Sequence, residues 1–166
     1  MTALIRRARR HPYFWLGIGA LFLVSLSLFA GLRGFAMRRI DGFTWQVSTG
    51  LLLFVVLAYQ WVLLAVRQMG LQSRMRMHFV AHRWMGIVTI VCFLLHAQRA
   101  GYGWTLALTL VFFFTGLSGL FSKEIVGYKR RWTYLLWLWC HICLAFSLVP
   151  MIAVHIWIAL TFQGAR

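Results

Sequence analysis

The chain has 166 residues, of which 62% are hydrophobic, 17% are aromatic and 11% are charged. An ordinary soluble domain carries about a quarter charged residues, so this composition leaves too little polar surface to cover a water-soluble globule. It also excludes disordered, collagen-like and disulfide-stapled chains. We therefore expect an integral membrane protein, and the length allows a single domain.

Long apolar runs separated by short polar connections set the organisation of the chain. About 20 apolar residues cross a bilayer as a helix. We therefore predict an all-α membrane bundle with spans at five places in the sequence, namely 13–34, 44–66, 79–98, 104–121 and 132–162. The length of the last run leaves a count of six open. The run at 13–34 is too long for a signal peptide and has no evident cleavage site, so we interpret it as a span.

The charged residues predict how the spans are oriented. Lys and Arg number 17 against 2 Asp and Glu, a formal net charge of +15. Twelve of the basic residues belong to the N-terminal segment and the second and fourth connections, and five to the other side. The positive-inside rule then places the N-terminus in the cytoplasm and the C-terminus outside, and we expect a bacterial inner membrane. Such basic connections contact anionic lipid headgroups and do not require nucleic acid.

Neither acidic residue lies inside a run: Asp41 and Glu124 both fall in connections. Proton-coupled carriers commonly use carboxylates within their spans. The sequence therefore argues against a carrier of that kind.

Four of the six histidines fall in the third and fifth runs with matched spacing. His82 and His96 are fourteen residues apart, and so are His141 and His155. In a helix this spacing returns to within about 40° of the same face and spans about 21 Å along the axis. The two runs are parallel, so packing them side by side would bring imidazoles face to face at two depths. Two such pairs form an axial ligand set for two haem irons.

A lone histidine in a span is most often a hydrogen-bonding group, but two identical spacings on parallel spans favour ligation. Gly86, one turn after His82, would let a flat macrocycle approach the helix. Arg83 and Arg99 flank the histidines of the third run and would either pair with haem propionates or only mark the topology. Pro150 in the last run is a candidate kink.

These residues resemble the ferric reductase-like transmembrane domain, a superfamily of ferric reductases, NADPH oxidases and the haem-binding membrane subunit of periplasmic methionine sulfoxide reductase. The resemblance covers residues 45–160 and rests on three stretches: His82-Arg-Trp-Met-Gly86 to His96, Thr115-Gly-Leu-Ser-Gly119, and His141 to His155. It implies two b-type haems between the third and fifth spans. The inner haem would take His82 and His141, and the outer haem His96 and His155.

The resemblance also implies a function. Residues 1–166 would form a single transmembrane cytochrome b-like domain, an electron-transfer subunit of an oxidoreductase that passes electrons from a cytoplasmic or quinol donor to an acceptor on the outer face. Two features depart from the family: the last spacing is fourteen where many members have thirteen, and no flavin and nicotinamide domain follows. Flavin is then expected only on a partner subunit, so a redox partner protein or quinol would supply the electrons, with quinone as a further candidate cofactor.

Three alternatives remain open. The equal spacings are also similar to those of the four-helix cytochrome b of quinol-oxidising complexes, although its Pro-Glu-Trp-Tyr motif is absent. A cofactor-free scaffold subunit would use the spans only as anchors. A transition-metal carrier would use Met75, Met77 and His78 as soft and imidazole ligands, and His78 could also replace His82 as the inner ligand.

The two cysteines of Cys140-His-Ile-Cys143 do not form a recognisable cofactor motif. Covalent haem attachment needs a histidine directly after the second cysteine, and Leu144 stands there. A zinc site of this type needs a second pair of ligands. We interpret both cysteines as small apolar side chains.

Overall fold

The computed structural model describes residues 8–9, 11–29, 42–97 and 101–163, and every element within them is a helix. Three helical stretches are long and apolar enough to cross a membrane: Gly42–Gln68, Ser73–His96 and Arg131–Phe162. Two further apolar helices, Pro12–Leu28 and Trp104–Leu120, are shorter. The all-helical prediction is therefore confirmed for the described residues, and three of the five expected spans have the required length.

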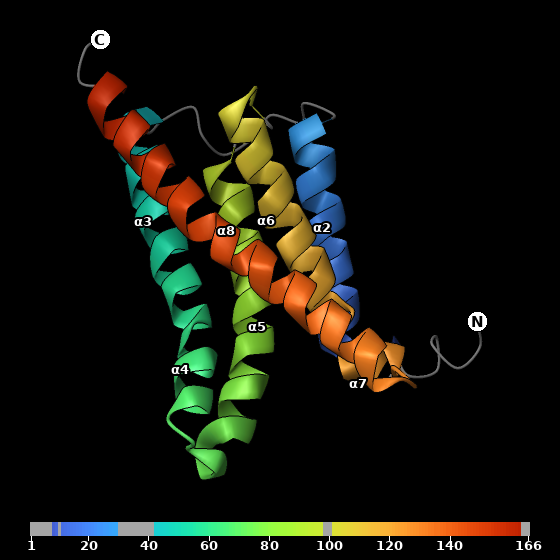
Figure 1. Ribbon diagram of the computed structural model, residues 1–166. Coiled ribbons are helices and arrows are strands. Elements are labelled where there is room, and N and C mark those ends of the chain that lie inside the picture. The colour runs from blue at the N-terminus through green and yellow to red at the C-terminus, as the bar shows by residue number, and fades with distance from the viewer. Residues whose placement is uncertain (1–7, 10, 30–41, 98–100, 164–166) are drawn as a thin grey trace. The chain divides into compact units, whose positions relative to one another are not determined.

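The chain divides into two compact units. Of the described residues, those between 8 and 97 belong to one unit, and residues 101–163 belong to the other. The first contains α2 (Pro12–Phe29), α3 (Gly42–Gln60), α4 (Val62–Gln68) and α5 (Gln72–His96) (Figure 1). The second contains α6 (Trp104–Leu120), α7 (Lys123–Val126) and α8 (Arg131–Gln163).

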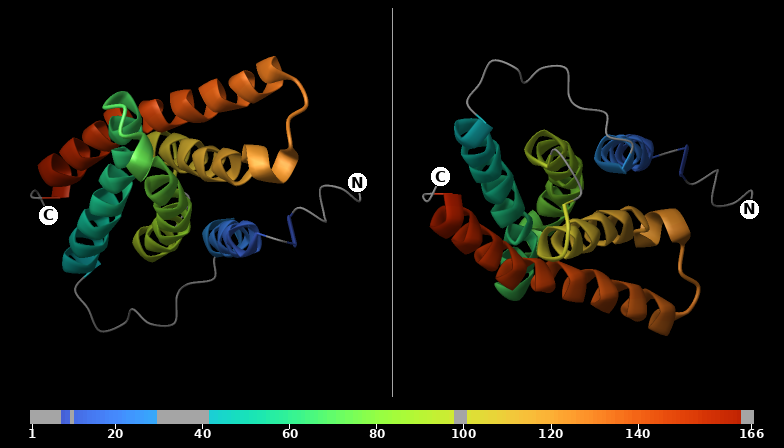
Figure 2. Two further views of the ribbon diagram at one scale, coloured as in Figure 1. Left: turned by 90° about the horizontal axis from the view of Figure 1, so that it is seen from below. Right: turned by 90° about the horizontal axis from the view of Figure 1, so that it is seen from above.

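Helix α5 is the centre of the first unit, because α2, α3 and α4 all pack against it. Figure 2 shows α2 and α3 beside it in both views. Val24 of α2, Val56 of α3 and Ile90 of α5 are among the side chains that this packing buries. The chain reverses between α4 and α5 at Gly70, whose φ of 67° suits a residue without a Cβ.

The second apolar run is not one continuous helix. α3 ends at Gln60, Trp61 forms a turn, and α4 begins at Val62. The Trp61 N–H donates to the carbonyl of Ala58, three residues back, at 3.1 Å. A helix end leaves its last carbonyls without partners in the helix, so this break supplies free acceptors in the middle of the run.

In the second unit, α6 packs against α8, and the short helix α7 connects them. Ile125 of α7 is fully buried and anchors this connection. α8 continues through Pro150 as one helix of 33 residues. A proline inside a helix removes the hydrogen bond to the carbonyl four residues back and crowds that carbonyl with its ring.

Few residues of the candidate spans are buried within the protein. Buried residues make up 6% of the most apolar window of Arg131–Phe162, and 22% of the windows of the other two spans. Water-soluble proteins rarely expose continuous apolar surface of this extent. The surface of these helices therefore suits lipid.

Candidate functional site

His96 is the last residue of α5 and packs against α3. Its Nδ1 lies 3.3 Å from the Thr49 hydroxyl oxygen. Thr49 donates its single hydroxyl hydrogen to the carbonyl of Trp45 at 2.7 Å, so its oxygen can only accept from His96. This contact favours the neutral imidazole that carries its proton on Nδ1, in which the lone pair able to bind a metal is on Nε2.

The same face of α3 fixes the end of α5 in two further ways. A Cβ at Gly50 would lie 3.0 Å from Cε1 of His96, so a larger residue there would require the ring to shift. The Trp45 indole N–H donates to the carbonyl of Leu95 at 3.1 Å, which supplies a partner in the last turn of α5.

The second unit repeats this arrangement around His141. Its Nδ1 lies 2.8 Å from the Ser118 hydroxyl oxygen of α6. Ser118 donates to the carbonyl of Thr115 at 2.8 Å, so it too accepts from the imidazole. A Cβ at Gly119 would lie 3.3 Å from Cε1 of His141. We call Thr49–Gly50 and Ser118–Gly119 the hydroxyl–glycine pairs.

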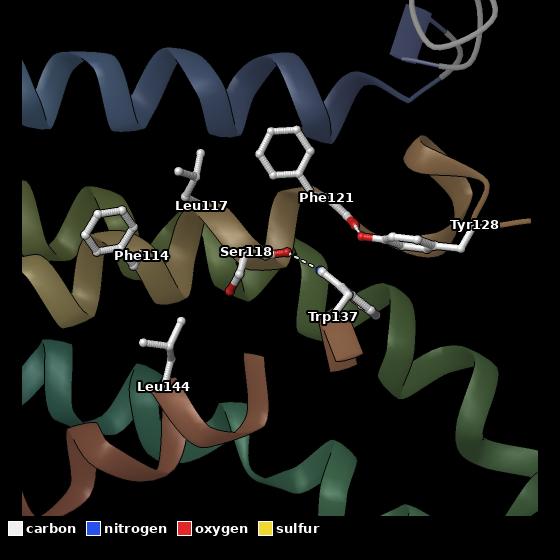
Figure 3. A pocket seen from close by; sticks show the side chains of 7 residues that line it. All are labelled: Phe114, Leu117, Ser118, Phe121, Tyr128, Trp137 and Leu144. Atoms are coloured by element: carbon white, nitrogen blue, oxygen red, sulfur yellow. Dashed lines mark hydrogen bonds between the residues drawn. The ribbon is translucent and has the colours of Figure 1, made fainter. Parts of the chain in front are cut away.

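A pocket of about 450 Å³ adjoins Ser118 in the second unit. Figure 3 shows its lining residues, which are Phe114, Leu117, Ser118, Phe121, Tyr128, Trp137 and Leu144. The indole N–H of Trp137 donates to the carbonyl of Ser118 at 2.8 Å, and the Tyr128 hydroxyl donates to the carbonyl of Phe121 at 3.0 Å. The hollow is open rather than enclosed, and its walls are mostly aromatic and aliphatic.

His82, in the first half of α5, is held differently. Its ring hydrogen-bonds to the main chain of Gln60, at the end of α3 where the helix breaks. A backbone carbonyl can only accept, so the imidazole donates. The Gln60 side chain continues this polar contact between α3 and α5, since its amide donates to the Thr89 hydroxyl at 3.4 Å.

The remaining predicted site residues have separate environments. His155 is half-buried in the second half of α8. The Arg83 guanidinium lies over the Phe79 ring at 4.0 Å and over the Tyr13 ring at 4.9 Å, two cation–π contacts within the first unit. Its role toward propionates stays a prediction. Arg99 lies outside the described residues.

Each expected ligand pair, His82 with His141 and His96 with His155, joins α5 to α8 and so joins the two units; the pairing stays a prediction. Within the described residues, no three His, Cys, Asp or Glu side chains gather into a metal site. Haem needs no such group, because the porphyrin supplies four nitrogens and the protein adds one or two axial ligands. A Cβ at Gly86 would meet nothing within 4 Å, so its surface in the first unit is open.

Thr49 and Gly50 were not identified from the sequence as site residues, and Ser118 appeared only within the Thr115–Gly119 stretch of the resemblance. The available signal was a hydroxyl residue followed by glycine within an apolar run, which occurs at Thr49-Gly50, Thr115-Gly116 and Ser118-Gly119. Comparisons with protein-family models, curated proteins and solved structures find no match for this chain. Function has to be inferred from the chemistry of these residues.

Proposed function

We propose that this protein is a b-type membrane cytochrome that carries electrons across the bilayer through two haems. One observation carries the proposal: both fourteen-residue histidine spacings lie on uninterrupted helices. α5 is continuous from His82 to His96, and α8 is continuous from His141 to His155 across Pro150. Each helix thus offers two imidazoles about 21 Å apart and near one face, a separation that suits one haem in each half of a membrane.

The hydrogen bonds of two imidazoles fit a haem ligand. The contacts of His96 and His141 favour the tautomer with the proton on Nδ1, which is the arrangement in which Nε2 binds a metal. Hydrogen bonds of this kind fix ring orientation and raise ligand basicity. His82 bonds to the Gln60 main chain through Nε2, because its buried Nδ1 makes no hydrogen bond within the described part of the chain, so iron binding through Nε2 would require that bond to be exchanged.

In this proposal His82 and His141 hold the inner haem, and His96 and His155 hold the outer one. Haem supplies a reversible one-electron couple when it is bound. The histidines of this chain would hold it, and the hydroxyls of Thr49 and Ser118 would orient two of the imidazoles. Arg83 and Arg99 would pair with the propionates, because guanidinium groups suit carboxylates.

The proposal includes five spans in a bacterial inner membrane, with the N-terminus cytoplasmic and the C-terminus outside. The protein would serve as an electron-transfer subunit similar to the ferric reductase-like transmembrane domain. Either quinol or a partner protein would supply the electrons, and any flavin would belong to that partner protein. The acceptor would lie on the outer face.

The first test is a dithionite-reduced minus oxidised spectrum of the purified chain, with haem measured against protein. We expect two b haems per chain. His82→Ala and His141→Ala should each remove one haem, and His96→Ala and His155→Ala the other. His11→Ala, outside the spans, is the matched control and should keep both.

Other results of this test would favour other interpretations of the histidines. Both haems retained in one of the four span variants would overturn the ligand assignment. A colourless protein whose histidine variants keep their fold would favour a scaffold subunit. Bound copper or zinc that is lost on changing Met75, Met77 and His78 would favour a metal carrier.

A further inference from the structure

The two hydroxyl–glycine pairs share one geometry in different helices. Thr49 of α3 meets His96 of α5, and Ser118 of α6 meets His141 of α8. In each case the hydroxyl donates to a carbonyl of its own helix, three or four residues back, and accepts from Nδ1. In each case the glycine that follows leaves room for the Cε1 edge of the ring.

We propose that Thr49 and Ser118 are positioning residues, which hold His96 and His141 as Nδ1–H tautomers and so deliver Nε2 to a haem iron. This inference rests on the proposed haem function. Its chemical basis is the direction of the hydrogen bonds: a hydroxyl has one hydrogen, and in both residues a carbonyl of the same helix already receives it. The imidazole is therefore the donor in both contacts.

A hydrogen bond from Nδ1–H gives the imidazole more anionic character and makes Nε2 a stronger donor. A stronger donor stabilises ferric iron over ferrous iron, which lowers the reduction potential of the haem. Thr49 would act in this way on the outer haem and Ser118 on the inner haem. Loss of either hydroxyl should raise the reduction potential of one haem only.

Thr49→Val and Ser118→Ala remove the hydroxyls while nearly preserving shape. Thr49→Ser and Ser118→Thr keep a hydroxyl at the same position. Ser25→Ala and Thr115→Val are matched controls, because those hydroxyls also donate to a carbonyl of their own helix, to Leu21 at 2.9 Å and to Val111 at 2.7 Å.

Two measurements are made on each variant of the full chain. Redox titration with haem quantification should show, for Thr49→Val, a higher potential and about 10- to 100-fold weaker affinity at one haem only. Ser118→Ala should affect the other haem. Nitrogen NMR of ¹⁵N-histidine-labelled protein without bound haem, in which no iron on Nε2 holds the proton on Nδ1, should show loss of one Nδ1–H tautomer in each variant. The variants that keep a hydroxyl and the controls should match the parent.

Unchanged potentials, affinities and tautomers in both Thr49→Val and Ser118→Ala would overturn the inference while leaving a haem protein. A parent chain without haem would instead contradict the proposed function. The NMR measurement still decides the positioning role in that case. An unchanged Nδ1–H population in Thr49→Val and Ser118→Ala would overturn that role.

Discussion

The indole of Trp137 lies parallel to the imidazole of His141, with ring centroids 6.1 Å apart and planes inclined by 10°. Ser118 holds both rings, because its carbonyl accepts from the Trp137 N–H and its hydroxyl accepts from His141 Nδ1, each at 2.8 Å. Trp137 and His141 are four residues apart on α8 and so share a face. The orientation of this imidazole is therefore set by stacking and by a hydrogen bond together.

Trp137→Phe keeps an aromatic ring on α8 but removes the bond to Ser118. We expect the free energy of unfolding to fall by about 1 kcal/mol, the usual net contribution of one hydrogen bond. Trp137→Ala removes the ring as well and should cost about 2–3 kcal/mol, less than for a fully buried indole because Trp137 is half-buried. Denaturant titration in detergent micelles measures both.

The control is Trp139→Phe, at an indole that is 62% exposed. It should change stability by less than about 0.5 kcal/mol. Equal losses in Trp137→Phe and Trp139→Phe would show that the bond to Ser118 contributes nothing specific.

Substitution of glycine by alanine should affect the stability of the two hydroxyl–glycine pairs differently. A Cβ at Gly50 would lie 3.0 Å from the His96 ring, and one at Gly119 would lie 3.3 Å from the His141 ring. Gly50→Ala should therefore destabilise the first unit by about 1–2 kcal/mol through overpacking. Gly119→Ala should be close to neutral, because the helix propensity of alanine offsets a smaller shift.

Gly19→Ala provides the baseline, since a Cβ there meets nothing within 4 Å. It should stabilise α2 by about 0.5–1 kcal/mol, the usual gain of alanine over glycine within a helix. Thermal unfolding followed by circular dichroism ranks the three variants. The order Gly19→Ala, Gly119→Ala, Gly50→Ala from most to least stable is expected, and a stable Gly50→Ala would contradict the close packing on His96.

The amino-acid sequence predicts the helices of this protein better than their ends. All five apolar runs contain helices, because their composition leaves no other way to satisfy the backbone in lipid. α5, however, begins at Gln72 and not at 79. Hydropathy marks the residues that lipid would cover, whereas a helix continues through basic residues such as Arg74 and Arg76.

The spacing of the histidines in the sequence could not predict which residues hydrogen-bond to them. Thr49 and His96 are 47 positions apart, and Ser118 and His141 are 23 apart. Their meeting depends on the rotation and depth at which neighbouring helices pack, which the periodicity of one helix does not specify. The break at Trp61, which presents the Gln60 main chain to His82, has no proline or charge to mark it.

Alkaline pH should weaken the second unit through Tyr128. Burial raises the pKa of this phenol above 10, and its hydroxyl donates to the carbonyl of Phe121. The folded state therefore favours the protonated phenol. This contribution is complete below about pH 10 and is lost as pH rises through the raised pKa. Unfolding measured from pH 8 to 12 should show a decline that Tyr128→Phe removes.

Tyr128→Phe should also lower stability at pH 8 by about 1 kcal/mol, because the hydrogen bond is lost. Tyr102→Phe is the control, at a side chain that is 94% exposed. It should leave the pH profile unchanged. If the Tyr128→Phe protein keeps the full alkaline decline, another group is responsible.

Reporter fusions distinguish a five-span chain from one with three spans. In the five-span arrangement, a reporter placed at Gly70 or Tyr128 lies in the cytoplasm, and one at Tyr102 or at the C-terminus lies outside. A chain that crosses only at the three long stretches would place the Tyr102 and Tyr128 connections on the same side, because α6 would not cross. With a cytoplasmic N-terminus, it would also place Gly70 outside and Tyr102 in the cytoplasm, while the C-terminus would stay outside.

Two reporters with opposite requirements make this test decisive. Green fluorescent protein fluoresces in the cytoplasm, whereas alkaline phosphatase is active only outside it, so every fusion site is read twice. We expect opposite readings at Tyr102 and Tyr128, since the 17 mostly apolar residues of α6 are at the lower limit of a transmembrane helix. Matching readings would show that α6 does not span. His82 and His141 would then lie on antiparallel helices, and the proposed pairing of imidazoles at equal depths would fail.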